Sequence, residues 1–332
     1  MSVPVRPSAA RSHELQYRAV TADELPACAE IWRASINDYI GRLGQLDVPL
    51  ETGPLLRLYT HLHATDPERF IAAIGPDPAA EGGQRIVAFA AAARRERLWF
   101  LSMLFVLPEL QGAGVGRALL ERVLPPAGDT DAVRATATDS AQPISNALYA
   151  TYGLVPRVPL LYLIGLPVRG DAFGELPSGV TAVPFEDVVG GPSDGENPGH
   201  GRLTAAVDAL DRELLGAAHQ FDHRFLRGEG RRGWLYLGPD GEALAYGYAG
   251  EAGRVGPVAT RDDALLAPIL GHLTTAIEPR GAFAMWLPGT ADRAVVPALR
   301  AGFRLDQFPI LLCWDRPFAD LARYLPISPG LL

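Results

Sequence analysis

The stretch Val106-Leu-Pro-Glu-Leu-Gln-Gly-Ala-Gly-Val-Gly-Arg-Ala-Leu-Leu120 decides the fold of this chain. It continues from an apolar, aromatic-rich run of strand length, Leu98–Val106, and Pro108 prevents that strand from extending further. The glycines at 112, 114 and 116 then allow a sharp turn, and apolar residues recur at helical spacing over 117–124. The stretch therefore predicts a buried strand, a glycine turn and an amphipathic helix in direct succession.

A turn of this kind brings bare backbone N–H groups together at the start of a helix. Because a helix N-terminus offers unpaired N–H donors and a partial positive charge, it binds an anion such as a pyrophosphate without any lysine. The spacing excludes two nucleotide motifs, since no Gly-Lys-Ser/Thr follows as in a Walker A loop and the glycines do not fall as G-x-G-x-x-G. A different phosphate-containing ligand is therefore expected.

The glycine pattern resembles the acyl-CoA loop Q/R-x-x-G-x-G/A of the GCN5-related N-acetyltransferases, the GNAT superfamily. Gln111, Gly114 and Gly116 match this pattern, and the preceding strand ends in a family-like 104–108 segment. A glycine pattern alone also fits a plain strand-to-helix connection in any α/β protein, so the surrounding sequence has to decide.

A second motif of the same family follows downstream. The family carries an Asn and then a Tyr four residues before a Gly-Phe, and this chain has Asn146, Tyr149 and Gly153, with Leu154 in place of the Phe. Two motifs in the family's order make a chance match improbable. The resemblance covers about residues 15–168.

The resemblance implies the residues of an acetyl-CoA site. It implies that Asn146 holds the pantetheine or phosphate side of the cofactor and that Tyr149 protonates the departing thiolate, although an ordinary core tyrosine remains the alternative for Tyr149. It implies that backbone N–H groups near Leu104 and Val106 hold the thioester carbonyl and the pantetheine arm. The loop that binds the pyrophosphate would consist of Gln111, Gly112, Ala113, Gly114, Val115, Gly116 and Arg117.

The fold class implied by the resemblance is α/β, with a mixed, mostly antiparallel sheet flanked by helices. The second half of the chain repeats the first weakly, since Leu244-Ala-Tyr-Gly echoes Val87-Ala-Phe-Ala. An offset of roughly 150 residues is the length of one ordinary domain. We therefore expect two tandem GNAT-like domains, residues 1–168 with the acyl-CoA loop and residues 169–332 as a degenerate copy.

The copy is not expected to bind CoA. Where the first half has its glycines, the second has Thr260-Arg-Asp-Asp-Ala without any glycine. Asp262 and Asp263 stand at the start of the expected helix, where they would repel a pyrophosphate and cap the helix themselves. Acetyl transfer is therefore expected in the first half.

The general base is left open by the sequence. Many family members place a carboxylate on the strand before the loop, but here Ser102 is the only polar side chain of that strand. The alternatives are a water-mediated base, a residue from elsewhere in the chain, or an amine that arrives already neutral. Glu96 is the nearest acidic candidate. The carboxylate of Leu332 is a further one, although simple packing of the apolar tail on the second half is favoured.

No metal ligand is expected. His219, Asp222 and His223 form a local acid and imidazole group, but no third ligand is apparent and a solvated helix face is favoured for them. Cys28 and Cys313 are expected to be buried small hydrophobic residues rather than a disulfide or a nucleophile.

Composition narrows the function classes. The chain has 332 residues, 48% of them hydrophobic, which is enough for two domains with substantial cores. A net charge of −8 without a basic face argues against nucleic acid as a partner. No run is long enough to span a membrane and no signal peptide is seen, so a cytoplasmic location is expected. A homodimer is left open.

The sequence therefore predicts an acyltransferase that moves an acetyl group from acetyl-CoA to a primary amine. The alternative is a non-catalytic acyl-CoA-binding module that acts as a sensor or scaffold, which would not need the missing strand carboxylate. The acceptor and the preferred acyl chain cannot be inferred from the sequence. A small-molecule amine, an aminoglycoside, an amino acid and a protein N-terminus are all compatible.

Overall fold

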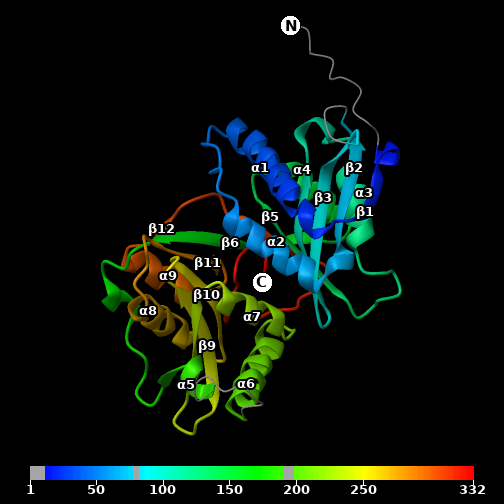
Figure 1. The fold of residues 1–332 in the computed structure, drawn as a ribbon. Helices are drawn as coiled ribbons and strands as arrows, with labels where there is room; N and C mark the ends of the chain where they lie inside the picture. Colours follow the sequence, from blue (N-terminus) through cyan, green and yellow to red (C-terminus); the bar gives the residue numbers. More distant parts are fainter. Residues whose placement is uncertain (1–11, 78–81, 190–197) are drawn as a thin grey trace. The chain divides into compact units, whose positions relative to one another are not determined.

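The structure is a computed structural model that describes residues 12–77, 82–189 and 198–332. By the density of its contacts the chain divides into two compact units (Figure 1). Unit 1 contains residues 1–94 and 99–132, and unit 2 contains residues 95–98 and 133–332. Among the described residues, no helix combines the length and the apolar character that crossing a membrane requires.

Unit 1 is built on a sheet in the order β1-β2-β3-β4, in which β1 and β3 both pair antiparallel with β2. The strand before the glycine turn and the helix after it, both expected from the sequence, are present. The strands are β1 (Gln16–Ala19), β2 (Phe70–Pro76), β3 (Gln84–Arg95) and β4 (Leu98–Val106), and the helices are α1 (Leu25–Arg42), α2 (Gly53–Thr65) and α3 (Val115–Val123).

The helices of unit 1 are held to the sheet by aromatic packing. Tyr59 of α2 lies edge-on to Phe70 of β2 and to Phe89 of β3, with ring centroids 5.8 and 5.4 Å away. Trp99 of β4 donates a hydrogen bond from its indole N–H to the carbonyl of Val123, the last residue of α3. Because all of these rings are buried, the strand before the glycine loop and the helix after it are fixed to one core.

Unit 2 contains a longer mixed sheet in the order β5-β13-β6-β11-β10-β9-β8-β7. The pairing of β10 with β11 is parallel, and the other neighbours along this path are antiparallel. Its strands are β5 (Val133–Asp139), β6 (Val155–Gly165), β7 (Thr181–Pro184), β8 (Arg231–Leu237), β9 (Ala243–Gly250), β10 (Arg254–Thr260), β11 (Phe283–Pro288), β12 (Arg304–Leu305), β13 (Ile310–Trp314) and β14 (Tyr324–Leu325).

Helices cover both faces of the unit 2 sheet, as the alternation along β9 shows. A Cβ placed on Gly247 would meet Leu273 and Ile269 of α8, whereas Tyr246 and Tyr248 point to the other face, toward α6 and α7. The helices are α4 (Pro143–Thr151), α5 (Phe185–Val189), α6 (Pro198–Leu214), α7 (Gln220–Gly228), α8 (Leu266–Ala276) and α9 (Asp292–Ala301). The predicted fold class, a mixed sheet flanked by helices, is confirmed.

A strand from the end of the chain is inserted between two strands of the first half. β13 pairs with β5 on one side, where Cys313 lies opposite Thr136, and with β6 on the other, where Leu312 lies opposite Val158. β6 in turn pairs with β11 of the second half. Apart from residues 95–98, the chain passes from unit 1 to unit 2 between residues 132 and 133, whereas the boundary at 168 stays a prediction about the sequence repeat.

Candidate functional site

The predicted glycine turn lies between β4 and α3 in unit 1. Gly112 and Gly114 have φ angles of 82° and 85°, in the left-handed region that glycine adopts at low cost, and Gly114 is the N-cap of α3. A glycine N-cap has no side chain with which to accept from the first N–H groups of the helix. A helix start without a side-chain cap is the kind that suits an external anion.

The loop is tied to the end of β4 at a single carbonyl. The amide of Gln111 donates to the carbonyl oxygen of Val106 over 3.1 Å, and the hydroxyl of Ser35 in α1 donates to the same oxygen over 3.0 Å. Ser35 is buried, and the sequence analysis missed it because one serine on an apolar helix face carries no signal by itself. The side chain of Gln111 therefore has an observed role in positioning the loop.

The surface around the loop is accessible. A Cβ on Gly112 would meet no heavy atom of the described residues within 4 Å. In β4 the first four residues, 98–101, are buried, while the next four, 102–105, which include Leu104, are only half-buried. The accessible half of the strand is thus the half that leads into the loop, and Arg117 stands exposed in the first turn of α3. Val115 is buried and anchors that turn.

Asn146 and Tyr149, the predicted cofactor-binding and catalytic residues outside the loop, both lie on α4 in unit 2. Tyr149 is buried, and burial raises its pKa above the ordinary value of a phenol, while a hydrogen bond with Ser145 acts in the opposite direction. Its hydroxyl therefore stays protonated at neutral pH. Asn146 donates from its amide to the carbonyls of Asp139 and Gln142 over 2.9 and 2.8 Å. Its buried Oδ1 has no hydrogen-bond partner among the described residues.

Glu96, the nearest acidic candidate for the general base, lies at the end of the strand that is remote from the loop. Glu96 lies in the turn before β4, with an unusual positive φ of 48°, so the whole strand of about 30 Å separates it from the end that carries the loop. Its carboxylate accepts from the guanidinium of Arg212 over 2.8 Å.

The apolar tail packs on the second half of the chain, as favoured in the sequence analysis. Tyr324 and Leu325 form β14, which pairs antiparallel with Ala259 and Val258 of β10. Leu331 and Leu332 are buried. Two buried leucines account for the apolar character of the tail without any catalytic role.

Among the described residues of the second half, the chain that follows β10 forms no glycine turn like the one after β4. Asp262 caps the segment before α8, and its carboxylate accepts from the N–H of Ala264 over 2.9 Å. The prediction that this helix start is capped by its own carboxylate is confirmed. The carboxylate of Asp262 would repel an anion at this position, and it already accepts from a backbone N–H that the anion would need.

A buried polar cluster in unit 2 corrects one expectation. His219, Asp222 and His223 do not lie on a solvated face, because all three are almost fully buried, as is Asp211 on α6. The side chain of Asp211 accepts from Tyr246 over 2.5 Å and lies 2.9 Å from Nε2 of His223. Spacing along α7 alone cannot show this, because Asp211 is supplied by another helix.

The charges of this cluster are set by their mutual contacts. Burial would lower the pKa of His219, but the adjacent Asp211 carboxylate raises it to about 10. Burial and the neighbouring charge of His219 lower the pKa of His223. Asp222 is held by Arg95, whose guanidinium donates two hydrogen bonds of 2.8 Å to its two carboxylate oxygens.

Comparison with known proteins gives a family match for part of the chain. Residues 76–162, which contain the glycine turn, Asn146 and Tyr149, match the family model of the acetyltransferase (GNAT) domain. No curated protein matches the sequence.

Solved structures match over nearly the whole length. A proposed acetyltransferase from Pyrococcus horikoshii superposes with a TM-score of 0.69 at 13% identity, covering 96% of each chain. A GCN5-related N-acetyltransferase from Sphaerobacter thermophilus gives 0.56 at 18% identity, covering 93% of this chain and 98% of that one. A tandem GNAT protein from the clavulanic acid biosynthesis pathway gives 0.50 at 15% identity, covering 92% and 99%. At these identities the likeness establishes a shared fold.

Proposed function

Because the chain carries a GNAT acetyltransferase domain and shares the GNAT fold over most of its length, we propose that it transfers an acetyl group from acetyl-CoA to a primary amine. In this reaction the amine nitrogen attacks the thioester carbonyl carbon, the C–N bond forms and the C–S bond breaks. The amine loses one proton and the CoA thiolate gains one. The acceptor is an amine of unidentified structure.

The observation that carries this proposal is the geometry of Gly114. A left-handed glycine as the N-cap of a nine-residue helix leaves the first N–H donors uncapped, beside a loop surface that is open at Gly112. This arrangement fits a pyrophosphate, which has the charge and the several acceptor oxygens that a helix N-terminus binds. The capped helix start at Asp262 does not fit one, which supports placing the cofactor in the first half.

The residues on α4 fit the remaining roles. The buried Oδ1 of Asn146 lacks a partner among the described groups and is suited to accept from an amide N–H, such as those of a pantetheine arm. Tyr149 stays protonated at neutral pH because burial raises its pKa, so its hydroxyl is available as the proton donor to a thiolate.

A second candidate function is supported by one observation on β4. The strand Leu98–Val106 contains no carboxylate, and Glu96 lies at its far end, so the usual position of a general base is filled by no acidic side chain. A module that binds acyl-CoA as a sensor or scaffold needs no such base.

Release of free CoA thiol distinguishes the two functions. The purified chain is incubated with acetyl-CoA and a panel that includes small amines, amino acids, an aminoglycoside and a peptide with a free N-terminus. Acetyl transfer predicts thiol release that depends on one class of amine, with the acetylated product seen by mass spectrometry. Tight acetyl-CoA binding with no amine-dependent release across the panel would favour the binding module.

A further inference from the structure

Three buried side chains of unit 2 point donor atoms at one another. Asp211 comes from α6, His219 is the residue before α7, and His223 lies one turn into α7. Their exposed fractions are 0%, 1% and 3%, and one donor atom from each lies within 4.8 Å of the other two. Nε2 of His219 is 3.3 Å from one Asp211 oxygen, and Nε2 of His223 is 2.9 Å from the other.

The local sequence explains how the two imidazoles come together. Residues four apart in a helical segment lie on the same side, and the rings of His219 and His223 have centroids 4.3 Å apart with planes tilted by 36°. Only a short link joins the end of α6 to the start of α7, so Asp211 in the last turn of α6 faces both rings.

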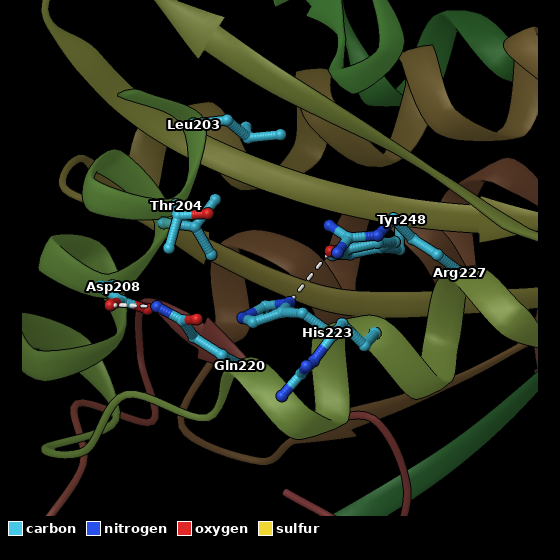
Figure 2. Close-up of a pocket in the computed structure, with 9 residues that line it drawn as sticks. Leu203, Thr204, Asp208, Gln220, His223, Arg227 and Tyr248 are labelled. Atoms are coloured by element: carbon cyan, nitrogen blue, oxygen red, sulfur yellow. Dashed lines mark hydrogen bonds between the residues drawn. The ribbon is translucent and has the colours of Figure 1, made fainter. Parts of the chain in front are cut away.

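The second nitrogen of each imidazole also faces a polar group. Nδ1 of His223 lies 2.9 Å from the hydroxyl of Tyr248, a contact drawn in Figure 2. Nδ1 of His219 lies 3.5 Å from a carboxylate oxygen of Asp222, which Arg95 holds with two hydrogen bonds. A carboxylate or a hydroxyl behind the ring is the kind of partner that can take the Nδ1 proton when a metal ion binds at Nε2.

We propose that Asp211, His219 and His223 form a binding site for one divalent transition-metal ion, with Zn²⁺ as the best match. Two imidazole nitrogens and one carboxylate oxygen form a donor set that Zn²⁺ prefers, whereas Mg²⁺ and Ca²⁺ prefer oxygen ligands alone. A tetrahedral ion with bonds of about 2.0–2.1 Å separates neighbouring ligand atoms by roughly 3.3 Å. The observed distances of 3.3 and 2.9 Å run to different oxygens of Asp211, so the three side chains would have to shift to bring one donor atom each around the ion.

One buried atom supports this assignment independently. Nδ1 of His219 makes no hydrogen bond to any described group, although it is fully buried. With an ion on Nε2, the proton of His219 would reside on Nδ1 and face the Asp222 carboxylate. The same ion would turn the proton of His223 toward Tyr248, whose hydroxyl is able to accept as well as to donate.

A pocket borders one residue of the cluster. It has a volume of about 130 Å³ and is lined by His223 together with Asp208, Gln220 and Tyr248 (Figure 2), whereas Asp211 and His219 do not line it. An ion would therefore have to approach the cluster from the side of His223. The site lies within the second half, and its effect would be to join α6 to α7 and so to stabilise unit 2.

Zinc titration of the full chain tests the proposal. The protein is treated with EDTA, desalted, and titrated with ZnCl₂ against a chromogenic chelator, and thermal unfolding is followed with and without the ion. The expected result is one Zn²⁺ per chain and a higher Tm in the presence of the ion. Replacement of Zn²⁺ by Co²⁺ should give the visible absorption of a tetrahedral complex.

Variants locate the site. His219→Gln and His223→Gln should each weaken Zn²⁺ binding at least 100-fold, whereas His272→Gln in the same unit and His61→Gln in the other should bind as the unchanged chain does. If the cluster variants fail to fold, Tyr248→Phe is used, and it should bind roughly 10-fold more weakly. The proposal would be overturned if the unchanged chain did not bind Zn²⁺, or if binding persisted in both cluster variants. Where Tyr248→Phe replaces the cluster variants, unaffected binding in that variant would overturn it.

Discussion

The ion pair between Arg95 and Asp222 gives a stability prediction that depends on burial alone. Both residues belong to unit 2, and their side chains are 8% and 2% exposed. A second pair in the same unit, Arg212 and Glu96, has the same shortest distance of 2.8 Å, but its side chains are 55% and 40% exposed. The two pairs therefore differ in solvation rather than in bond length.

Arg95→Met removes the buried cation and keeps much of its apolar stem. It leaves the Asp222 carboxylate buried without its two hydrogen bonds, and breaking a buried pair from one side costs about 3–5 kcal/mol. For a unit of about 200 residues this corresponds to a fall in Tm of roughly 6–20 °C. Arg212→Met should leave Tm unchanged within error, because an exposed pair is screened by solvent.

The assay is thermal unfolding in the presence of EDTA, followed by tryptophan fluorescence and by far-ultraviolet circular dichroism. The double variant Arg95→Met with Asp222→Leu removes both charges, so it should be more stable than Arg95→Met alone. An equal loss of Tm in Arg95→Met and Arg212→Met would refute the role of burial. A double variant that is less stable than either single one would refute the explanation by an uncompensated charge.

Three further changes test the account. Tyr149→Phe should lower kcat about 100-fold with little change in acetyl-CoA affinity, because it removes a proton donor and keeps the buried ring; steady-state kinetics checks this, with Tyr152→Phe as the control. A hydrogen bond from Arg18 lowers the pKa of Glu24 to about 2, so its stabilisation is present above about pH 4.5 and is lost as the pH falls toward 2. Glu24→Gln should therefore cost about 1 kcal/mol at pH 7 in urea unfolding, because the partly solvated pair is worth less than the full shift, and this cost should shrink to a small remainder as the pH reaches 2. Leu119→Ala, at a fully buried position of α3, should cost about 3–5 kcal/mol in the same assay, and a loss below 1 kcal/mol would contradict the packing described for α3.

The parts of the fold that the sequence predicts are those whose information is local. The strand, turn and helix around Gly114 follow from periodicity and from glycine's access to positive φ, and all three are present as expected. The capped helix start at Asp262 follows from the chemistry of a carboxylate beside free N–H groups. In each case the residues that decide the structure are neighbours in the chain.

The features that the sequence analysis missed depend on pairings between distant segments. No local pattern indicates that β13 is inserted between β5 and β6, because its partners in the sheet lie more than a hundred residues earlier in the chain. The cluster around His219 was assigned to a solvated face because two histidines at helical spacing fit that assignment. Only the fold supplies Asp211 from α6 and Arg95 from the end of β3, and these two residues make burial of the cluster tolerable.

A calorimetric titration of the chain with acetyl-CoA shows whether the glycine turn holds the cofactor. It is repeated on Gly114→Asp, which places a carboxylate at the helix start, and on Gly128→Asp, which adds the same charge at an exposed glycine of the same unit. One acetyl-CoA should bind per chain in the unchanged protein and in Gly128→Asp, and none should bind to Gly114→Asp. No binding by the unchanged protein, or equal binding by all three, would contradict the assignment of the glycine turn as the acetyl-CoA site.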